Sequence, residues 1–293
     1  MPYAIALDLG GTQTRAALVD ENGNVSNRVS LPTPAQDGGE AVVAQLAKAA
    51  EQAAQGEADI IGVGLSSPGP LDTDKGLAID LPTIKGMINF PIRAALEAKL
   101  NRKVHLENDG IAAAIGEWKH GAGQGLKSVV YVTVSTGIGG GVIVDGNVLR
   151  GRKGMAGHVG HLAIYPDGLR CNCGNAGCWE AYAAGPAFTA RANAKSAADV
   201  FAAAYAGDTK AQKHVDEEAR LLGIGITSLL HLYSPEKIII GGGLSNAFDQ
   251  LHPGIDAYIQ QNAMLAFKDV PVVKAALGGN SGLIGAAMMV FGK

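Results

Sequence analysis

The sequence is poor in aromatic side chains, and this scarcity argues against one large class of partner. Aromatic residues make up 5% of the 293 residues, too few for the stacking platforms that bind single-stranded nucleic acids. Lysine and arginine together number 24 against 27 acidic residues, which gives a net charge of -3. A chain without excess positive charge lacks the electrostatic field that attracts polyanions. We therefore expect no nucleic-acid partner.

Long apolar runs and scattered cysteines are also missing. Asp8 interrupts the first apolar segment, no cationic stretch precedes it, and no uncharged run reaches the length that spans a bilayer. We therefore expect no signal peptide, no membrane partner and a cytoplasmic location. The three cysteines fall at 171, 173 and 178, and an odd, clustered set in a reducing compartment favours a metal site over disulfides.

Glycine, in contrast, is abundant, with 41 residues, and the apolar content of 47% is enough for substantial cores. A strand, a glycine turn and a second strand, followed by further strands and helices, occur near 4–65 and again near 128–240. This repetition favours two related α/β lobes with a cleft between them. Apolar spacing predicts strands at 60–65 and 103–109, and helices at 40–55, 91–100, 111–121, 179–192, 197–206, 209–232 and 282–290.

Two of the glycine turns have the composition of phosphate-binding loops. In residues 8–14 (DLGGTQT), backbone amides and Thr12 could surround phosphate oxygens, with Asp8 near a Mg²⁺ ion. In residues 135–141 (STGIGGG), two hydroxyls precede glycines in a similar way. Each turn alone is also compatible with an ordinary hairpin, but two together indicate a nucleotide site. A third turn, 241–243, fits either a purine or ribose against the backbone or a plain bend.

One histidine and the three cysteines have the spacing of a metal site. His161, Cys171, Cys173 and Cys178 form the pattern H-x9-C-x-C-x4-C. Three thiolates and one imidazole complete the tetrahedral shell of Zn²⁺ and leave no open position, so such a site would be structural. The alternative is three buried free cysteines and a core histidine.

A carboxylate at the end of a strand is the candidate for acid–base chemistry. Residues Glu107, Asn108 and Asp109 end the segment 103–109, just before an alanine-rich helix. Asp109 could accept the proton of a sugar hydroxyl as that hydroxyl attacks a γ-phosphoryl group, and Asn108 could hold a neighbouring hydroxyl. Aspartate is also a preferred helix N-cap. The residues alone leave both interpretations open.

Taken together, the motifs resemble the ROK family of sugar kinases, in the family's order and over nearly the whole chain. This resemblance implies the actin-like (ribonuclease H-like) ATPase-domain fold, duplicated in two α/β lobes that close on sugar and ATP, with Mg²⁺ dependence and a homodimer. We expect an N-terminal lobe at 1–118 plus helix 282–293, and a C-terminal lobe at 119–281 with the zinc-binding loop. The segments that carry the likeness are DLGGTQTR, SSPGPLD, ENDGIAAAIGEW, VSTGIGGGVIVDG, GHVGH, CNCGNAGCWEAYAAG and IIIGGGL.

The resemblance also assigns roles to individual residues. It implies that Asp109 is the catalytic base and that Asn108, His161 and Glu180 contact the sugar, with Ser67 a candidate on the same side. Zinc would then position His161 and Glu180 rather than take part in the chemistry. Phosphate and adenosine contacts are implied for Gly10, Gly11, Thr12, Thr136, Gly137, Gly241 and Gly242.

Three departures from the family pattern bear on the substrate. Gln13 stands where most members have lysine, and Asp80 is the candidate where members usually have an asparagine sugar contact. The family pattern Gly-Glu-x-Gly-His reads GHVGH at 157–161. His158 therefore replaces a glutamate that, in the family, binds hydroxyls near the anomeric end of the sugar. Imidazole can donate a hydrogen bond as well as accept one, which changes the C1 and C2 substituents that suit the pocket.

The histidine form of this pattern, together with LPTPA at 31–35, is similar to bacterial N-acetylmannosamine kinases. We therefore expect an ATP-dependent kinase that converts N-acetylmannosamine to its 6-phosphate in sialic-acid catabolism. A glucokinase or N-acetylglucosamine kinase of the same family is the alternative. A non-catalytic sugar-responsive regulator is disfavoured by the presence of Asp8 and Asp109, and because a loop beginning at residue 8 leaves no room for an N-terminal helix-turn-helix.

Overall fold

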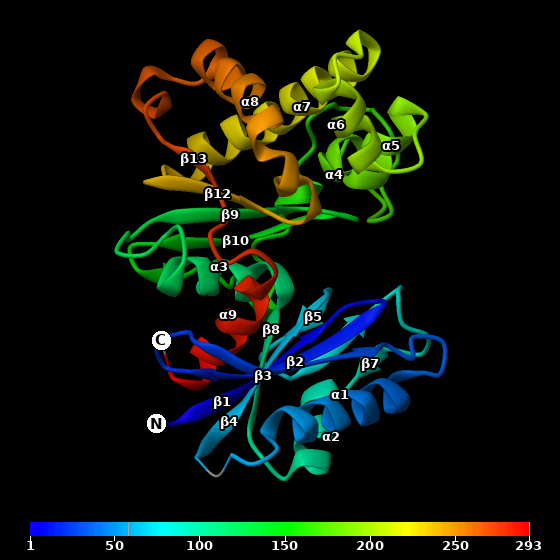
Figure 1. Cartoon of the computed structure of the whole chain (residues 1–293), viewed down its shortest axis with the longest axis vertical. Coiled ribbons are helices and arrows are strands. Elements are labelled where there is room, and N and C mark those ends of the chain that lie inside the picture. Colours follow the sequence, from blue (N-terminus) through cyan, green and yellow to red (C-terminus); the bar gives the residue numbers. More distant parts are fainter. Residues whose placement is uncertain (58, 293) are drawn as a thin grey trace. The chain divides into compact units, whose positions relative to one another are not determined.

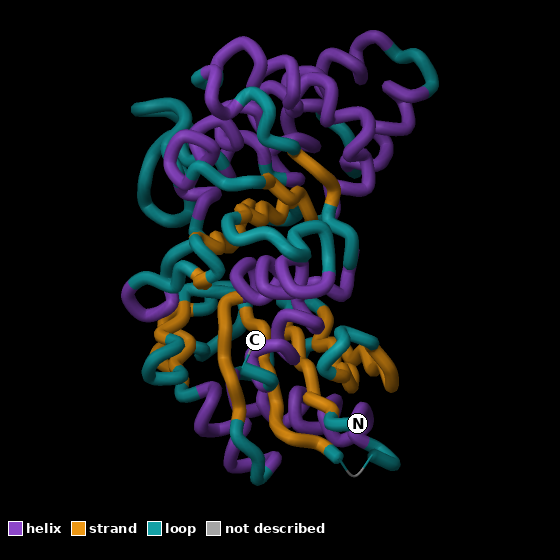
Figure 2. The backbone as a smooth tube through the Cα atoms, turned by 90° about the vertical axis from the view of Figure 1, so that its left-hand side faces the viewer, coloured by secondary structure: helices purple, strands orange, loops and turns teal. Residues whose placement is uncertain are grey.

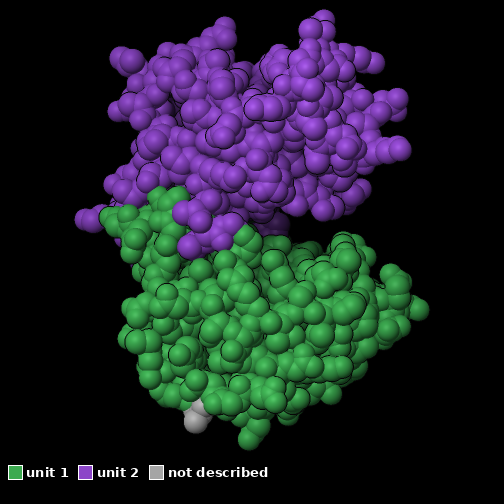
Figure 3. Space-filling view, viewed as in Figure 1, with its two compact units in different colours: residues 1–125, 148–157, 279–293 green, residues 126–147, 158–278 purple. Residues whose placement is uncertain are grey.

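The computed structural model describes residues 1–57 and 59–292 and divides into two compact units (Figures 1 and 3). The expected boundary after residue 118 differs from the observed one, and the chain returns to the first unit twice. Residue 293, the end of the expected terminal helix, lies outside the described residues. Unit 1 consists of residues 1–125, 148–157 and 279–293, and unit 2 of residues 126–147 and 158–278.

Unit 1 is built on a five-stranded sheet in the order β3-β2-β1-β4-β8, in which β1, β4 and β8 are parallel and β2 and β3 antiparallel. A small sheet, β5-β6-β7, accompanies it. The strands are β1 (Tyr3–Leu9), β2 (Gln13–Asp20), β3 (Val25–Pro32), β4 (Ile60–Ser67), β5 (Leu71–Asp72), β6 (Leu77–Asp80), β7 (Ile88–Phe90) and β8 (Val104–Asn108). The helices are α1 (Gly39–Ala54), α2 (Ile92–Leu100), α3 (Asp109–His120) and α9 (Ser281–Val290), with 3₁₀ turns η1 (Arg152–Gly154) and η5 (Gly278–Asn280).

Strand β1 separates two differently built faces of this sheet. Its residues Ile5, Leu7 and Leu9 belong to the apolar core that includes α1. Because successive side chains of a strand point to opposite faces, the other face carries alanine and ends in Asp8. Helix α9 covers that face, and a Cβ placed on Gly282 in its first turn would lie 3.4 Å from Asp8 Oδ1. The start of α9 is therefore beside the carboxylate.

Small residues allow α3 and α9 to pack closely on this face. A Cβ at Gly64 of β4 would overlap the carbonyl oxygen of Ala286 in α9, and a Cβ at Gly285 would overlap that of Ala112 in α3. Such contacts leave no room for larger side chains, because protein interiors are packed as densely as organic crystals. Helix α9 is thus held directly against β4 on one side and against α3 on another.

Unit 2 repeats the plan of unit 1, with a sheet in the order β11-β10-β9-β12-β13 in which β9, β12 and β13 are parallel. Its helices lie on one face of these strands (Figure 2). The strands are β9 (Val129–Val134), β10 (Ile138–Val144), β11 (Asn147–Val148), β12 (Lys237–Gly241) and β13 (Val272–Lys274). The helices are α4 (Glu180–Ala183), α5 (Gly185–Ala192), α6 (Ala197–Tyr205), α7 (Thr209–Tyr233) and α8 (Phe248–Asn262), with 3₁₀ turns η2 (Val159–His161), η3 (Gly243–Ala247) and η4 (Leu265–Phe267).

The single helix expected over 179–192 is interrupted. Ala184 adopts extended backbone, with ψ at 157°, between α4 and α5. Pro186 stands in the first turn of α5, where its fixed φ favours a helix start rather than continuation of an earlier helix. Across residues 1–57 and 59–292, no helix has both the length and the apolar character that crossing a membrane requires.

We expect Gly64→Ala to lower the free energy of unfolding by about 1–3 kcal/mol, because the added methyl group must displace backbone of α9. The matched control is Gly139→Ala in β10, whose Cβ would meet its nearest neighbour, Thr133 Cγ2, at 3.4 Å. Denaturant unfolding of the two variants measures the difference. Equal effects would contradict the close packing of β4 against α9.

Candidate functional site

The parallel register of unit 1 aligns polar residues at one edge of the sheet. Asp8 of β1 pairs with Ser66 of β4, and Ser66 pairs with Glu107 of β8. One step further, Ser67 pairs with Asn108. The carboxyl ends of parallel strands are the usual ligand-binding edge of α/β sheets. The sheet therefore brings together residues that lie about 100 positions apart in the sequence.

Asp8 is buried and held at both carboxylate oxygens. Ser66 Oγ donates to its Oδ1 at 2.9 Å, and Arg15 forms an ion pair with its Oδ2. Arg15 also donates to the carbonyl oxygen of Gly279 at 3.1 Å. A carboxylate oxygen is a preferred ligand of Mg²⁺, and the Arg15 side chain is 45% exposed, so it can turn into solvent. Asp8 therefore fits the expected magnesium ion.

The first glycine turn is a tight hairpin between β1 and β2. The Gly10 N–H donates to the carbonyl oxygen of Gln13 at 2.9 Å, and Thr33 Oγ1 donates to the carbonyl oxygen of Gly10 at 2.8 Å. A Cβ on Gly10 would lie 2.9 Å from the Gln13 oxygen, too close for any side chain. Gly11 and Thr12 are exposed, which leaves this turn accessible to a phosphate.

The N-cap of α3 is Asn108 rather than Asp109. Asn108 Oδ1 accepts hydrogen bonds from the N–H groups of Gly110 at 3.0 Å and Ile111 at 3.4 Å. Asp109 is the first helical residue, and its Oδ1 accepts from Gly110 N–H at 2.8 Å. The cap interpretation of Asp109 is thus wrong. The capping bonds occupy Asn108 Oδ1, so a hydroxyl ligand would meet the donor side of this amide.

Asp109 combines solvent access with a strongly perturbed pKa. Burial raises the pKa of its carboxyl group to about 6; the nearby negative charge of Asp8 adds to this effect, and the hydrogen bond from Gly110 opposes it. The side chain is nevertheless exposed to solvent, so the carboxylate is closely surrounded by protein yet open on one side. A carboxyl group that titrates near neutrality is well matched to general-base catalysis at physiological pH.

Sequence reasoning missed the partner of Glu107. This side chain is 1% exposed, and burial raises its pKa while Arg150, whose Nε donates at 2.8 Å, opposes the rise. Arg150 lies in the segment 148–157, which returns to unit 1. Pairing across 43 residues has no local signal that could have revealed it. Ser67, the other residue expected here, is fully buried, and its Oγ donates to the carbonyl oxygen of Pro68 at 3.2 Å.

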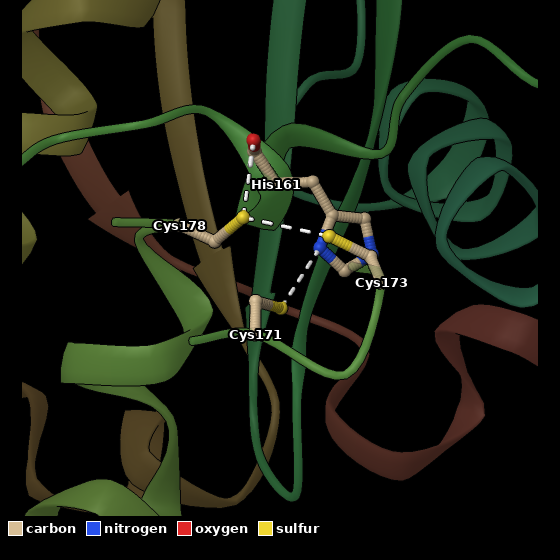
Figure 4. A group of neighbouring side chains, drawn as sticks. All are labelled: His161, Cys171, Cys173 and Cys178. Carbon is tan, nitrogen blue, oxygen red and sulfur yellow. Dashed lines mark hydrogen bonds between the residues drawn. The ribbon is translucent and has the colours of Figure 1, made fainter. Parts of the chain in front are cut away.

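In unit 2 the four expected metal ligands converge (Figure 4). Their ligand atoms all lie within 4.8 Å of one another. Cys171 Sγ is 3.7 Å from His161 Nδ1, and Cys173 Sγ is 3.6 Å from Cys178 Sγ. Ligand atoms around tetrahedral Zn²⁺ lie roughly 3.5–3.8 Å apart, whereas a disulfide requires about 2.05 Å. Burial raises the pKa of the Cys178 thiol, so a dication is needed to hold it as thiolate. The cluster fits a structural Zn²⁺ ion.

Glu180 follows the cysteine segment and lies against the second glycine turn. Its Oε2 accepts the N–H of Ile138 at 2.9 Å, and a Cβ on Gly137 would lie 2.5 Å from the same oxygen. His158 lies beside His161, with ring centroids 6.2 Å apart and planes inclined by 21°. Unit 2 therefore gathers three of the residues expected to contact the sugar, His158, His161 and Glu180, around the zinc cluster and the 135–137 turn.

The third glycine turn adjoins the second. A Cβ on Gly243 would lie 3.6 Å from Ser135 Oγ, and Thr136 is exposed. Gly242 has φ at 82°, and a Cβ there would overlap the carbonyl oxygen of Val134, so only glycine fits. Ser245 Oγ fixes the turn by donating to the Gly242 carbonyl oxygen at 2.7 Å. Gly241 also has no room for a side chain, because of Tyr131.

These candidates form two sets, one in each unit, and comparison with known proteins identifies their family. The sequence pattern of the ROK family matches residues 4–293. The chain belongs to the ROK family. A glucokinase of Halalkalibacterium halodurans is 34% identical over 98% of this chain and 94% of that protein. An N-acetylmannosamine kinase of Salmonella typhimurium is also 34% identical, over 98% of each chain.

Solved structures of ROK proteins confirm the expected fold. The crystal structure of a ROK family glucokinase from Streptomyces griseus in complex with glucose and AMPPNP matches with a TM-score of 0.87 at 32% identity, over 99% of this chain and 100% of that one. The duplicated sheet order of the two units agrees with the actin-like ATPase fold of these ROK kinases. The fold and family predicted from the sequence are therefore confirmed.

We expect the purified ROK protein to contain about one Zn²⁺ per chain, and His161→Gln to lose most of it, because one of four ligands is removed. Elemental analysis after gel filtration measures the metal content. The matched control is His158→Gln, which changes the neighbouring imidazole and should leave the zinc content unchanged. Equal zinc loss in both variants would contradict the ligand set.

Proposed function

We propose that this chain is an ATP-dependent sugar kinase that phosphorylates the 6-hydroxyl of N-acetylmannosamine. The observation that carries the kinase assignment is Asp109, a solvent-accessible carboxyl group whose pKa is raised to about 6 at the ligand-binding edge of the unit 1 sheet. Membership of a family whose matched relatives are named sugar kinases supports the same reaction class.

In the proposed reaction, ionised Asp109 accepts the proton of the 6-hydroxyl while that oxygen bonds to the γ-phosphorus. The bond from the γ-phosphorus to the bridging oxygen breaks, and ADP leaves. Asn108 holds a neighbouring hydroxyl through its amide N–H groups, since its oxygen caps α3. The turns at 10–12 and 136–137 donate backbone N–H groups to phosphate oxygens. Mg²⁺, held by Asp8, supplies neutralisation of phosphate charge when it is bound.

The choice of sugar is assigned to unit 2. His161 and Glu180 contact sugar hydroxyls, and the zinc cluster fixes both residues in place. Glucokinases and N-acetylmannosamine kinases match at similar identity, 33–36% and 33–34%, so overall similarity does not favour either substrate. His158 supports N-acetylmannosamine because an imidazole can donate to an N-acetyl carbonyl oxygen, which a carboxylate cannot. Glucose is the second candidate, because glucokinases match this well.

The proposal extends to the setting of the reaction. A kinase of free N-acetylmannosamine belongs to sialic-acid catabolism, and we assign it to the cytoplasm, where ATP is present and thiols stay reduced. The homodimer that the family resemblance implies is part of the same proposal, and sedimentation of the purified chain tests it.

We expect Asp109→Asn to lower kcat about 10³-fold, because general-base catalysis contributes roughly 10²–10⁴-fold. Coupled detection of ADP release measures turnover. The matched control is Asp208→Asn at the N-terminus of α7, since asparagine caps helices as well as aspartate does. In the wild type, kcat/KM should rise with pH to a plateau above a pKa of about 6, because only ionised Asp109 accepts the proton.

This acid limb should disappear in the residual activity of Asp109→Asn. Turnover within a few-fold of wild type, in a variant with unchanged circular dichroism, would show that Asp109 is not the base.

We expect the wild type to prefer N-acetylmannosamine over glucose in kcat/KM, and His158→Glu to shift this ratio toward glucose about 10-fold. The reason is the loss of a hydrogen-bond donor in the pocket, worth roughly a factor of ten. The control His158→Gln keeps both donor and acceptor and should keep the preference. A wild type that favours glucose would overturn the sugar assignment, and no turnover with any hexose would favour a non-catalytic regulator.

A further inference from the structure

The segment 179–191, which contains Glu180, is held against helix α7 at both ends of the segment. At the first end, Trp179 is fully buried and its Nε1 donates to the carbonyl oxygen of Leu221 at 2.9 Å. A Cβ on Gly225, one turn further along α7, would overlap the Trp179 ring. The residue directly before Glu180 is therefore fixed by packing and by a hydrogen bond.

At the other end, an ion pair links α5 to α7. Arg191 of α5 pairs with Glu218 of α7, whose side chain is 0% exposed. Arg191 also donates through Nη1 to the carbonyl oxygen of Tyr182 in α4 at 2.8 Å. One guanidinium group thus joins three helices, and its contact with α4 lies in the last turn, where a cation is favoured.

This pair is poorly suited to a purely stabilising role. Burial raises the pKa of Glu218 to about 8 in spite of the Arg191 charge. Glu218 Oε1 and Arg191 Nε have no hydrogen-bond partner among the described residues. Buried ion pairs with unsatisfied atoms often stabilise a fold no better than apolar residues of similar size. Stability alone therefore does not explain the pair, and the contact of Arg191 with the Tyr182 carbonyl oxygen indicates a role in holding α4.

Helix α4 needs external support because it has only four residues, Glu180–Ala183. A helix this short is unstable alone, since forming its first turn orders several residues for one hydrogen bond. Its first residue, Glu180, accepts the N–H of Ile138, and the residue two positions earlier, Cys178, belongs to the zinc cluster. Any tilt of α4 would move both groups.

We propose that Arg191 and Glu218 are positioning residues that fix α4, so that Glu180 keeps its place against the 135–138 turn and Cys178 its place in the metal cluster. The role of Glu180 in sugar binding rests on the proposed function. The expected effect on zinc retention does not depend on that proposed function.

The test compares Glu218→Gln with the wild type in two measurements. The variant keeps the shape of the side chain but replaces the carboxyl group that binds Arg191 Nη2 with an amide, which weakens the contact that orients Arg191. We expect the KM for sugar to rise about 10-fold with kcat changed less than about threefold, because the altered group contacts no reacting atom. A colorimetric chelator should remove zinc about 10-fold faster, as weakened ligand support lowers metal affinity roughly 10–100-fold.

The matched control is Glu217→Gln, the adjacent residue on α7, which forms an exposed ion pair with Arg220. Exposed pairs contribute little, so neither measurement should change. Unchanged sugar KM and zinc release in Glu218→Gln would overturn the proposal. If no variant or wild type phosphorylates a sugar, the proposed function fails, and zinc release still decides the positioning role.

A double variant, Arg191→Met with Glu218→Leu, separates positioning from stability. Apolar residues of similar volume should preserve the fold, but the Tyr182 carbonyl oxygen loses its donor. We expect the raised sugar KM and the faster zinc release to persist although the unfolding midpoint is near that of the wild type. Return of both measurements to wild-type values would show that the ion pair is only structural and would overturn the proposal, even if Glu218→Gln does not fold.

Discussion

The parallel register of β1, β4 and β8 is the constraint on which unit 1 depends. It aligns Asp8 with Ser66 and Ser66 with Glu107. Because side chains alternate along a strand, a shift of one residue would turn Asp8 into the apolar face that packs on α1. The close packing of α9 on the opposite face excludes such a shift, since Gly64 leaves no space beneath Ala286. Backbone pairing and small side chains together decide where the carboxylate points.

The carboxylates at this edge of the sheet differ in whether a cationic side chain is paired with them. Asp8 is paired with Arg15, and Glu107 is paired with Arg150. At Asp109, burial and the negative charge of Asp8 raise the pKa, whereas backbone hydrogen bonds at Gly110 and Asp109 and a side-chain hydrogen bond with Asn108 lower it. An adjacent cation favours the ionised form of a carboxylate; at Glu107 this effect only partly offsets burial, which raises the pKa. Both paired carboxylates are also buried, whereas Asp109 is exposed, so solvent access as well as pairing distinguishes Asp109 from its neighbours.

Local patterns in the sequence were enough to predict most of the longer helices, several strands, the glycine turns and the metal cluster, but not the break between α4 and α5. They were not enough to decide between Asn108 and Asp109 as the cap of α3, because both residues favour that position. Nor could they reveal the pairing of Glu107 with Arg150, or the return of 148–157 to unit 1. These features arise from tertiary contacts between residues far apart in the chain, which leave no periodic or spacing signal.

The two units fix their candidate site residues by different physical means. This difference explains which side-chain arrangements can be predicted from the sequence. In unit 1, short motifs single out Asp8 and Asp109 one at a time, but the strand register that aligns the polar residues leaves no motif. In unit 2, residues 158–185 contain little regular structure beyond η2 and α4, so Glu180 and His161 need cross-links instead. A metal site requires particular residue types at particular spacings, and it therefore leaves a clear motif. The Arg191–Glu218 pair serves the same segment but joins separate helices, and so it became visible only in the structure.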